Sequence, residues 1–382
     1  MGAGTAGLRL GGWRDAAGRR GMNLGGMNGS VGRSMPTPGE APESFETRIQ
    51  AAHAACRRLR EAIGRVVVGQ DEVVEQVLWG LVAGGHVLLE GNPGLGKTLL
   101  VRTVAACLEL RFSRIQFTPD LMPSDVTGTN VLSLGADNAT KPRFELHRGP
   151  IFGQVVLADE INRATPKTQS ALLEAMQEHA VTIAGTRHAL EEPFFVLATE
   201  NPIEMEGTYP LPEAQLDRFL LKVVVRQPSE DELTAILVRT TGQPAETPSA
   251  VLAKGEALEL RSLCRDVAVA ESVFRYAARL VGASAPDAPN APPLVQRAVR
   301  LGAGVRGAQA LILAGKAVAL LEGRGNVSFA DVQRTAKPVL RHRILRSFEG
   351  EADAISTDAV VDELVAAIPV RPEAVERAVR NG

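Results

Sequence analysis

The stretch H-V-L-L-E-G-N-P-G-L-G-K-T, from His86 to Thr98, decides the fold of this chain. Its first five residues are a short apolar run of the kind that predicts a buried strand, and a glycine-rich loop follows directly. Residues 99–108 then show the periodicity of a helix. The loop matches the pattern G-x-x-x-x-G-K-S/T in full, between a strand and a helix as that pattern requires. We therefore predict a phosphate-binding loop at the carboxyl end of a buried strand.

Each residue type in this loop has a chemical reason to be there. Glycines let backbone N–H groups turn inward around phosphate oxygens, and the positive end of the following helix faces the same anion. Lys97 is expected to reach the β- and γ-phosphates of ATP, and Thr98 to supply a hydroxyl to Mg²⁺. The candidate nucleotide ligands in the loop are Gly91, Asn92, Pro93, Gly94, Leu95, Gly96, Lys97 and Thr98.

An acidic pair follows a second apolar run. The residues V-V-L-A-D-E, 155–160, deliver Asp159 and Glu160 at the end of a predicted strand, which is the edge where open α/β sheets bind ligands. Asp159 is expected to hold Mg²⁺ together with Thr98, and Glu160 to polarise the attacking water. A small-molecule kinase does not need this neighbouring base, and the guanine-reading N-K-x-D of a GTPase is absent from the sequence.

A third polar element follows the next strand. In A-T-E-N-P, 198–202, Asn201 comes after the apolar run 194–199. An Asn-Pro pair alone is a common turn initiator. We expect strand order to place this amide beside the acidic pair, where it can bond the attacking water or the γ-phosphate.

Strands and helical patterns alternate until Pro228, with further strands predicted at 114–117, 154–158, 194–199 and 220–225. That alternation predicts an α/β fold with a parallel sheet covered by helices on both faces. Only helical patterns follow, at 257–268, 271–282, 306–322, 328–340 and 357–367. We predict a disordered glycine- and arginine-rich tail at 1–44, a nucleotide-binding core at 45–228, a connection with the start of the second domain at 229–256, and an all-α domain at 257–382.

The composition of the chain limits the classes of partner that it is expected to bind. The 42 Lys and Arg against 44 Asp and Glu give a formal net charge of −2, which offers no electrostatic case for nucleic acid. No apolar run reaches the roughly 20 residues of a membrane span, so we expect no stable membrane insertion. Cys56, Cys107 and Cys264 lack C-x-x-C spacing; we expect small buried side chains in a reducing, cytoplasmic setting.

These motifs together resemble the AAA+ ATPases, and more narrowly the MoxR family, over about residues 46–370. The matching stretches are V-V-V-G-Q (66–70), L-L-E-G-N-P-G-L-G-K-T (88–98), I-Q-F-T-P-D-L-M-P-S-D-V-T-G (115–128), H-R-G-P-I-F (147–152), A-D-E-I-N-R-A (158–164), A-T-E-N-P (198–202), G-T-Y-P-L-P-E-A-Q-L-D-R-F (207–219) and V-L-R-H-R (339–343). So many matches in order make the resemblance specific.

The resemblance implies roles for further residues. Asn201 is similar to sensor 1, and Arg218 in L-D-R-F to the arginine finger that enters a neighbouring copy's site. Arg306 resembles sensor 2 on a helical lid, through which the lid would close on ATP. Its surroundings are G-A-G-V-R-G-A rather than the usual G-A-S-P-R, which puts the lid geometry in doubt. Gly69 and Gln70 are implied to lie near the adenine.

The resemblance also implies a function. It is that of a Mg²⁺-dependent ATPase, assembled as a ring and expected to be a hexamer, that remodels or matures partner protein complexes in a chaperone-like way. A protein with a von Willebrand factor A domain is the implied partner, and the loops at 119–150 and 178–193 resemble inserts that face such partners; otherwise they are solvated loops. Two alternatives stay open: a nucleotide-gated interaction scaffold with little turnover, and a DNA-acting motor. The intact Glu160 and Arg218 argue against the first, and the near-neutral charge against the second.

Overall fold

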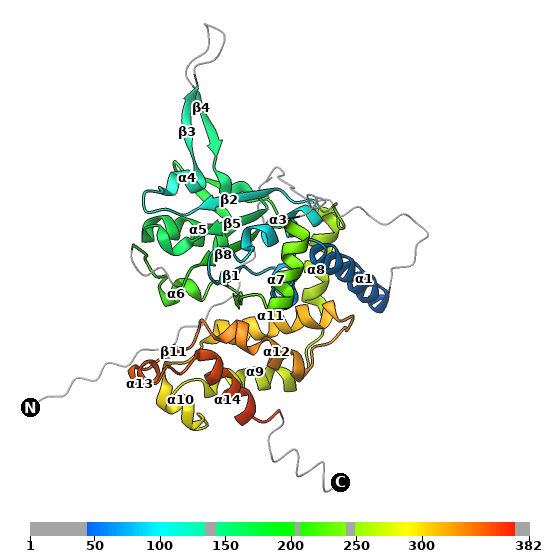
Figure 1. The fold of residues 1–382 in the computed structure, drawn as a ribbon, viewed down its shortest axis with the longest axis vertical. Helices are drawn as coiled ribbons and strands as arrows, with labels where there is room; N and C mark the ends of the chain where they lie inside the picture. The colour runs from blue at the N-terminus through cyan, green and yellow to red at the C-terminus, as the bar shows by residue number, and fades with distance from the viewer. Residues whose placement is uncertain (1–43, 134–142, 203–206, 242–248, 371–382) are drawn as a thin grey trace, which may run out of the picture. The chain divides into compact units, whose positions relative to one another are not determined.

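The computed structural model describes residues 44–133, 143–202, 207–241 and 249–370 (Figure 1). The predicted tail at 1–44 lies outside the described residues except for Ser44, whose hydroxyl caps the first helix by accepting a bond from the Thr47 N–H.

A five-stranded parallel sheet organises the first part of the chain, in the order β2-β5-β8-β1-β9. Its strands are β1 (Val87–Glu90), β2 (Phe112–Gln116), β5 (Val155–Asp159), β8 (Phe195–Glu200) and β9 (Leu221–Val224). The five predicted strands are therefore confirmed, with ends that differ by one or two residues. Because all five run parallel, the phosphate loop after β1 and the acidic residues that end β5 lie at one edge of the sheet.

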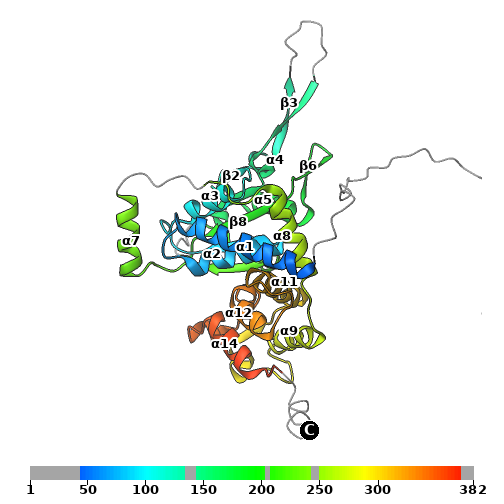
Figure 2. The ribbon, with the colours of Figure 1, turned by 90° about the vertical axis from the view of Figure 1, so that its right-hand side faces the viewer.

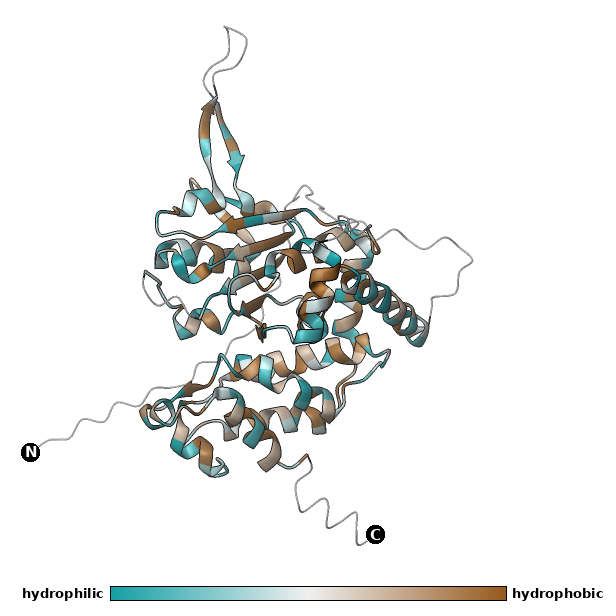
Figure 3. Ribbon diagram, viewed as in Figure 1, coloured by the Kyte–Doolittle hydropathy of each residue, from teal (hydrophilic) through white to brown (hydrophobic). Residues whose placement is uncertain are grey.

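The two faces of this sheet bury alternate residues. On β1, Val87 and Leu89 join the core on one face while Leu88 joins the core on the other, as the period of two in a strand requires. The central strands are accordingly hydrophobic along their length (Figure 3). On the first face lie α1 (Phe45–Gly64), α2 (Asp71–Ala83) and α3 (Lys97–Cys107). The second is covered by α5 (Pro166–Glu178), α4 (Pro123–Thr127) and the short η1 (Pro150–Phe152).

Two antiparallel hairpins occupy the segments predicted as loops or inserts. The first pairs β3 (Gly128–Ser133) with β4 (Arg143–Arg148), and Figures 1 and 2 show it projecting away from the sheet. The second pairs β6 (Ala180–Ile183) with β7 (Thr186–Ala189).

The remaining residues are mainly helical. The helices are α7 (Glu230–Thr240), α8 (Lys254–Asp266), α9 (Glu271–Ala283), α10 (Pro293–Ala298), α11 (Val305–Leu321), α12 (Phe329–Leu340), α13 (Phe348–Ala352) and α14 (Thr357–Ala367). The expectation of helices alone is wrong in one place: β10 (Val299–Leu301) pairs with β11 (Leu345–Arg346). These strands are too short to give a periodic signal.

The three cysteine thiols are buried and free, and burial raises the pKa of Cys56 and Cys264 to about 12. They therefore behave as small apolar side chains rather than as reactive thiolates. Among the described residues, no helix combines the length and the apolar character that crossing a bilayer would take.

Candidate active site

The phosphate loop joins β1 to α3 and is shaped by glycines. Gly94 and Gly96 have positive φ values of 82° and 75°, a region that glycine enters without steric cost. No described atom lies within 4 Å of the point where either residue would carry a Cβ. Gly91 is tightly surrounded instead, because a Cβ there would lie 2.8 Å from the carbonyl oxygen of Val225. The loop is thus anchored at its start and open at its centre.

Lys97 lies at the start of α3 and is 8% exposed. One of its three N–H donors bonds the carbonyl oxygen of Gly91 at 2.5 Å. Burial lowers the pKa of the ammonium, while the nearby charges of Asp159 and Glu160 oppose that shift. A buried cation facing two carboxylates and an open glycine loop is suited to receive phosphate oxygens.

Gln70 contacts the phosphate loop through its side chain. Its side-chain N–H donates to the carbonyl oxygen of Leu95 at 2.6 Å, while its Oε1 is buried without a partner among the described residues. The neighbouring Gly69 has φ of 71° and closely faces the side chain of Glu232 on α7. The V-V-V-G-Q segment therefore contacts both the phosphate loop and the first helix beyond the sheet.

The acidic pair is held by a hydroxyl that sequence reasoning did not identify. Thr199, next to the end of β8, donates to Oδ1 of Asp159 at 2.7 Å. The same hydroxyl oxygen accepts a bond from the backbone N–H of Glu160 at 2.8 Å. Glu160 has φ of 56°, a left-handed conformation, so this bond helps to hold an unfavourable backbone geometry.

Strand β2 contributes two further groups that the sequence analysis missed. The Arg114 side chain bonds Oδ2 of Asp159 through Nη2 at 2.7 Å and Nε at 3.1 Å. Two residues along, the Gln116 amide donates to Oε2 of Glu160 at 2.9 Å, and Arg163 bonds the same oxygen at 3.0 Å. The spacing of two in R-I-Q was the available signal, because such residues share one face of a strand.

Asn201 follows the end of β8 and is 4% exposed. Since β8 pairs with both β5 and β1, Asn201 lies between the acidic pair and the phosphate loop. Its carbonyl oxygen accepts a bond from Asn162 at 3.4 Å, and the N–H of Gly91 bonds the carbonyl of Glu200 at 3.2 Å. The structure therefore brings this residue to the same edge as Lys97.

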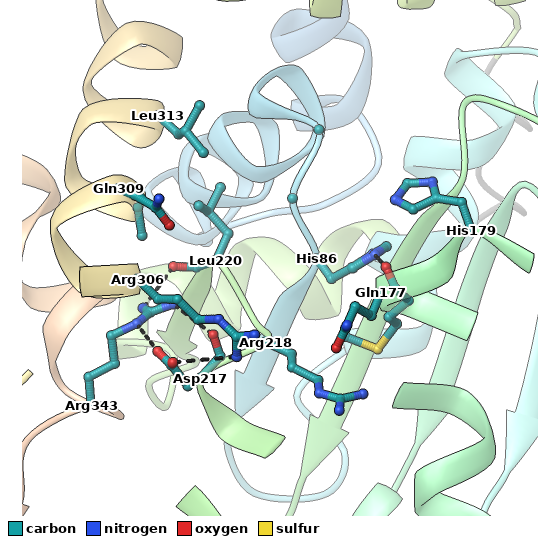
Figure 4. A pocket seen from close by; sticks show the side chains of 14 residues that line it. His86, Gln177, His179, Asp217, Arg218, Leu220, Arg306, Gln309, Leu313 and Arg343 are labelled. Carbon is teal, nitrogen blue, oxygen red and sulfur yellow. Dashed lines mark hydrogen bonds and ion pairs between the residues drawn. The ribbon is translucent and has the colours of Figure 1, made fainter. Parts of the chain in front are cut away.

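Arg218 and Arg306 lie elsewhere. They line a cavity of about 270 Å³ together with Gly85 and His86, which precede β1 (Figure 4). Because β1 is four residues long, this cavity is separated from the phosphate loop by roughly 13 Å of strand, at about 3.3 Å per residue. Arg218 Nη1 bonds the carbonyl of Leu173 at 2.7 Å, and its Nε is buried without a partner among the described residues.

The structure thus brings Arg306 together with Arg218 rather than with the phosphate loop of its own chain. Arg306 is in the first turn of α11, and its Nη1 lies 3.6 Å from Oδ2 of Asp217, the residue before Arg218. Two cations share one cavity at the amino edge of the sheet, and both remain partly exposed.

The donor set at the carboxyl edge fits a nucleotide with Mg²⁺. It combines a buried ammonium at Lys97, the N-terminus of α3, the half-buried hydroxyl of Thr98 and the nearly buried carboxylate of Asp159. Cation, hydroxyl and carboxylate are the groups that phosphate oxygens and a hard divalent ion require.

Family comparisons agree with this geometry. Residues 86–221 match the model of the ATPase family associated with various cellular activities (AAA), and residues 293–364 match that of the AAA lid domain. The first range covers the sheet from β1 to the first residue of β9, and the second covers α10 to α13 and most of α14.

Individual relatives are similar in sequence over most of the chain. YeaC of Bacillus subtilis is 44% identical over 83% of this chain and 95% of its own length. Chaperone MoxR1 of Mycobacterium tuberculosis is 40% identical over 87% of each. A solved structure of a candidate ATPase from Cytophaga hutchinsonii superposes with a TM-score of 0.79 at 38% identity, over 86% of this chain and 98% of its own.

Proposed function

We propose that this chain, which belongs to the MoxR family of AAA+ ATPases, hydrolyses ATP at a site that a second copy of the chain completes. The observation that carries the proposal is the separation of two groups of residues. Lys97, Asp159 and Glu160 converge at the carboxyl edge of the sheet, whereas Arg218 lies at its amino edge. An arginine that cannot reach the phosphate loop of its own chain is suited to the loop of a neighbour.

Each group then has a chemical role. Lys97 and backbone N–H groups of the phosphate loop bind the phosphates, and Glu160 orients and polarises the attacking water. Thr98 and Asp159 would hold Mg²⁺, which supplies charge compensation for the developing phosphoryl oxygens when it is bound. Asn201, which follows β8, is proposed to hydrogen-bond the water or the γ-phosphate beside Glu160.

The neighbour supplies cations. Arg218 stabilises the charge of the transition state, a contribution worth about 10³-fold or more in rate for arginine fingers. Arg306 shares its cavity and is proposed to act on the same nucleotide, rather than on that of its own chain. Such a head-to-tail contact repeats from copy to copy and closes as a ring, for which we propose six copies.

The proposed output is remodelling of partner proteins. The relative MoxR1 is named as a chaperone, and the β3–β4 hairpin exposes Val131 and Phe144, the latter by 74%. Exposed apolar side chains on a projecting element are typical of protein contacts. We propose that this hairpin contacts the client, that the core at 45–228 and the lid at 257–382 form the two domains, and that a von Willebrand factor A domain protein cooperates with them.

Phosphate release and nucleotide binding test the proposal together. Glu160→Gln should bind ATP with wild-type affinity and lose turnover, Lys97→Ala should lose binding, and Arg218→Ala should bind but not hydrolyse. Wild-type specific activity should rise steeply with protein concentration over the assembly range. Equal, slow phosphate release by the wild type and Glu160→Gln would favour a nucleotide-gated scaffold, and activity that does not depend on concentration would exclude the shared site.

A further inference from the structure

The segment R-H-R at 341–343, which follows α12, contacts the backbone of the segment that carries Arg218. Arg341 Nη1 donates to the carbonyl of Lys222 at 3.2 Å, and His342 Nε2 donates to that of Phe219 at 3.2 Å. Arg343 bonds the carbonyls of Phe219 at 2.6 Å, Leu220 at 3.2 Å and Asp217 at 3.3 Å. Three consecutive lid residues thus bind one short stretch of the core, 217–222.

The carboxylate of Asp217 adds charge to this contact. Its Oδ1 accepts a bond from Arg343 Nε at 2.8 Å, and its Oδ2 lies 3.6 Å from Arg306 on α11 (Figure 4). The Arg343 side chain is only 3% exposed. Because a buried guanidinium is costly unless its donors are paired, its position is closely defined by these acceptors.

Arg218 stands in the middle of the contacted stretch. Its own N–H bonds the carbonyl of Gln215 at 3.1 Å, in the turn that leads from α6 (Glu213–Leu216) to β9. Arg343 therefore binds carbonyls on both sides of Arg218, at Asp217 and Phe219, and leaves the Arg218 side chain directed at the carbonyl of Leu173 and the cavity. A rotation of the lid against the sheet has to move this turn or break the bonds that hold it.

We propose that Asp217 and the lid segment Arg341–Arg343 are positioning groups for Arg218, so that the lid of one copy sets the activity of its neighbour's nucleotide site. The inference rests on the proposed function, in which Arg218 acts on a neighbouring copy. It makes the lid a coupling element between adjacent sites.

Complementation between full-length variants tests this inference. Arg343→Gln and Asp217→Asn should each lower kcat about 100-fold, the loss expected when a catalytic group is displaced by about 1 Å, and should bind ATP as wild type does. Each has an intact nucleotide site and a displaced finger, whereas Lys97→Ala has the opposite defect. An equimolar mixture with Lys97→Ala should recover about a quarter of wild-type activity, since half of the competent sites then face an intact finger in a head-to-tail ring.

Three controls accompany the complementation experiment. Arg275→Gln removes an exposed lid arginine that pairs with Glu271 and should leave activity unchanged. Arg218→Ala mixed with Lys97→Ala tests the shared site alone. Melting temperatures of both positioning variants show whether they fold, and Asp217→Asn is the milder one because Asp217 is 29% exposed.

Recovery by Arg343→Gln or Asp217→Asn supports the inference. Recovery by Arg218→Ala but by neither positioning variant overturns it and leaves the shared site standing, as does a large fall in melting temperature for both. Failure of Arg218→Ala to recover overturns the shared site, and this inference with it.

Discussion

The hydroxyl of Thr199 donates a 2.7 Å hydrogen bond to Oδ1 of Asp159 and accepts a 2.8 Å bond from the N–H of Glu160. One fully buried side chain on β8 therefore orients both members of the acidic pair that ends β5. The two carboxylates that we propose hold Mg²⁺ and activate water are therefore positioned relative to each other by a residue to which we assign no contact with the nucleotide.

Thr199→Val should lower kcat about 100-fold with little change in nucleotide affinity, because displacing a catalytic group by about 1 Å costs that much. It leaves two buried polar groups without their partner, at about 1–3 kcal/mol each, so the unfolding free energy should also fall. Thr199→Ser keeps the hydroxyl and should restore most of the activity. Steady-state phosphate release and urea denaturation measure both effects. A serine variant as slow as the valine variant would show that the methyl group, not the hydroxyl, is what matters.

Arg114 should compete with Mg²⁺ for Asp159. Its two bonds to Oδ2 place a positive charge on the carboxylate assigned to the metal, and the pair is partly exposed. Arg114→Gln should therefore lower the Mg²⁺ concentration that half-saturates nucleotide binding about fivefold, the equivalent of about 1 kcal/mol for such a pair. Fluorescent ADP titrated at a series of Mg²⁺ concentrations gives this value without turnover.

Arg111→Gln is the matched control for Arg114→Gln. Arg111 precedes the same strand, but its ion pair is with Glu191. If Arg114→Gln required more Mg²⁺ than Arg111→Gln, the arginine would support the metal instead of competing with it.

Acid should destabilise the fold through His86. The ring donates to the carbonyl of Met176 and accepts the N–H of Val196, so the neutral form satisfies both bonds. Burial lowers the pKa of His86 to about 4. Because the unfolded chain titrates near 6.5, stability is lost as the pH falls from about 6.5 to 4, by about 2 kcal/mol at pH 5 from this residue.

His86→Gln retains one donor and one acceptor without a titrating proton. Urea denaturation at pH 7 and pH 5 should show a smaller acid loss in this variant than in the wild type. Part of the loss should remain, because burial also lowers the pKa of His342 well below its usual value. Parallel losses in the two proteins would assign the acid sensitivity to other groups.

Ser328 should stabilise the lid from the start of α12. Its hydroxyl accepts the N–H of Asp331 at 3.3 Å, and the carboxylate of Asp331 accepts the N–H of Ser328 at 2.7 Å. Ser328→Ala should cost about 1 kcal/mol of unfolding free energy, as the loss of such caps does. Ser328→Thr, which keeps an acceptor, should cost less. A wild-type melting temperature for the alanine variant would show that Asp331 holds the helix start alone.

Much of the fold could be predicted because it depends on local pattern. Apolar runs with the right length predicted the five strands, and helical periodicity predicted α12, which begins one residue after the predicted start at 328. The β10–β11 pair was not, since it joins segments more than forty residues apart and neither strand is long enough to be periodic.

The candidate site likewise has a part that the sequence predicted and a part that it did not. The phosphate loop and the acidic pair are contiguous in sequence, and their chemistry follows from residue type and from the strands that they end. By themselves those residues predicted a site for nucleotide phosphate at the carboxyl edge of a parallel sheet. Contacts across strands, as from Thr199 and Arg114 to Asp159, required the strand order β2-β5-β8 and the register of each pair.

Only the tertiary structure decided where the two arginines lie. Arg218 and Arg306 are 88 residues apart in sequence, yet packing of the lid on the turn before β9 brings both to Asp217 and to the edge opposite Lys97. A sequence motif shows which chemical groups are present, because its residues are close together in the chain. The distance between a cation and a phosphate site depends on how the C-terminal helices pack against the sheet, and no local sequence pattern determines that packing.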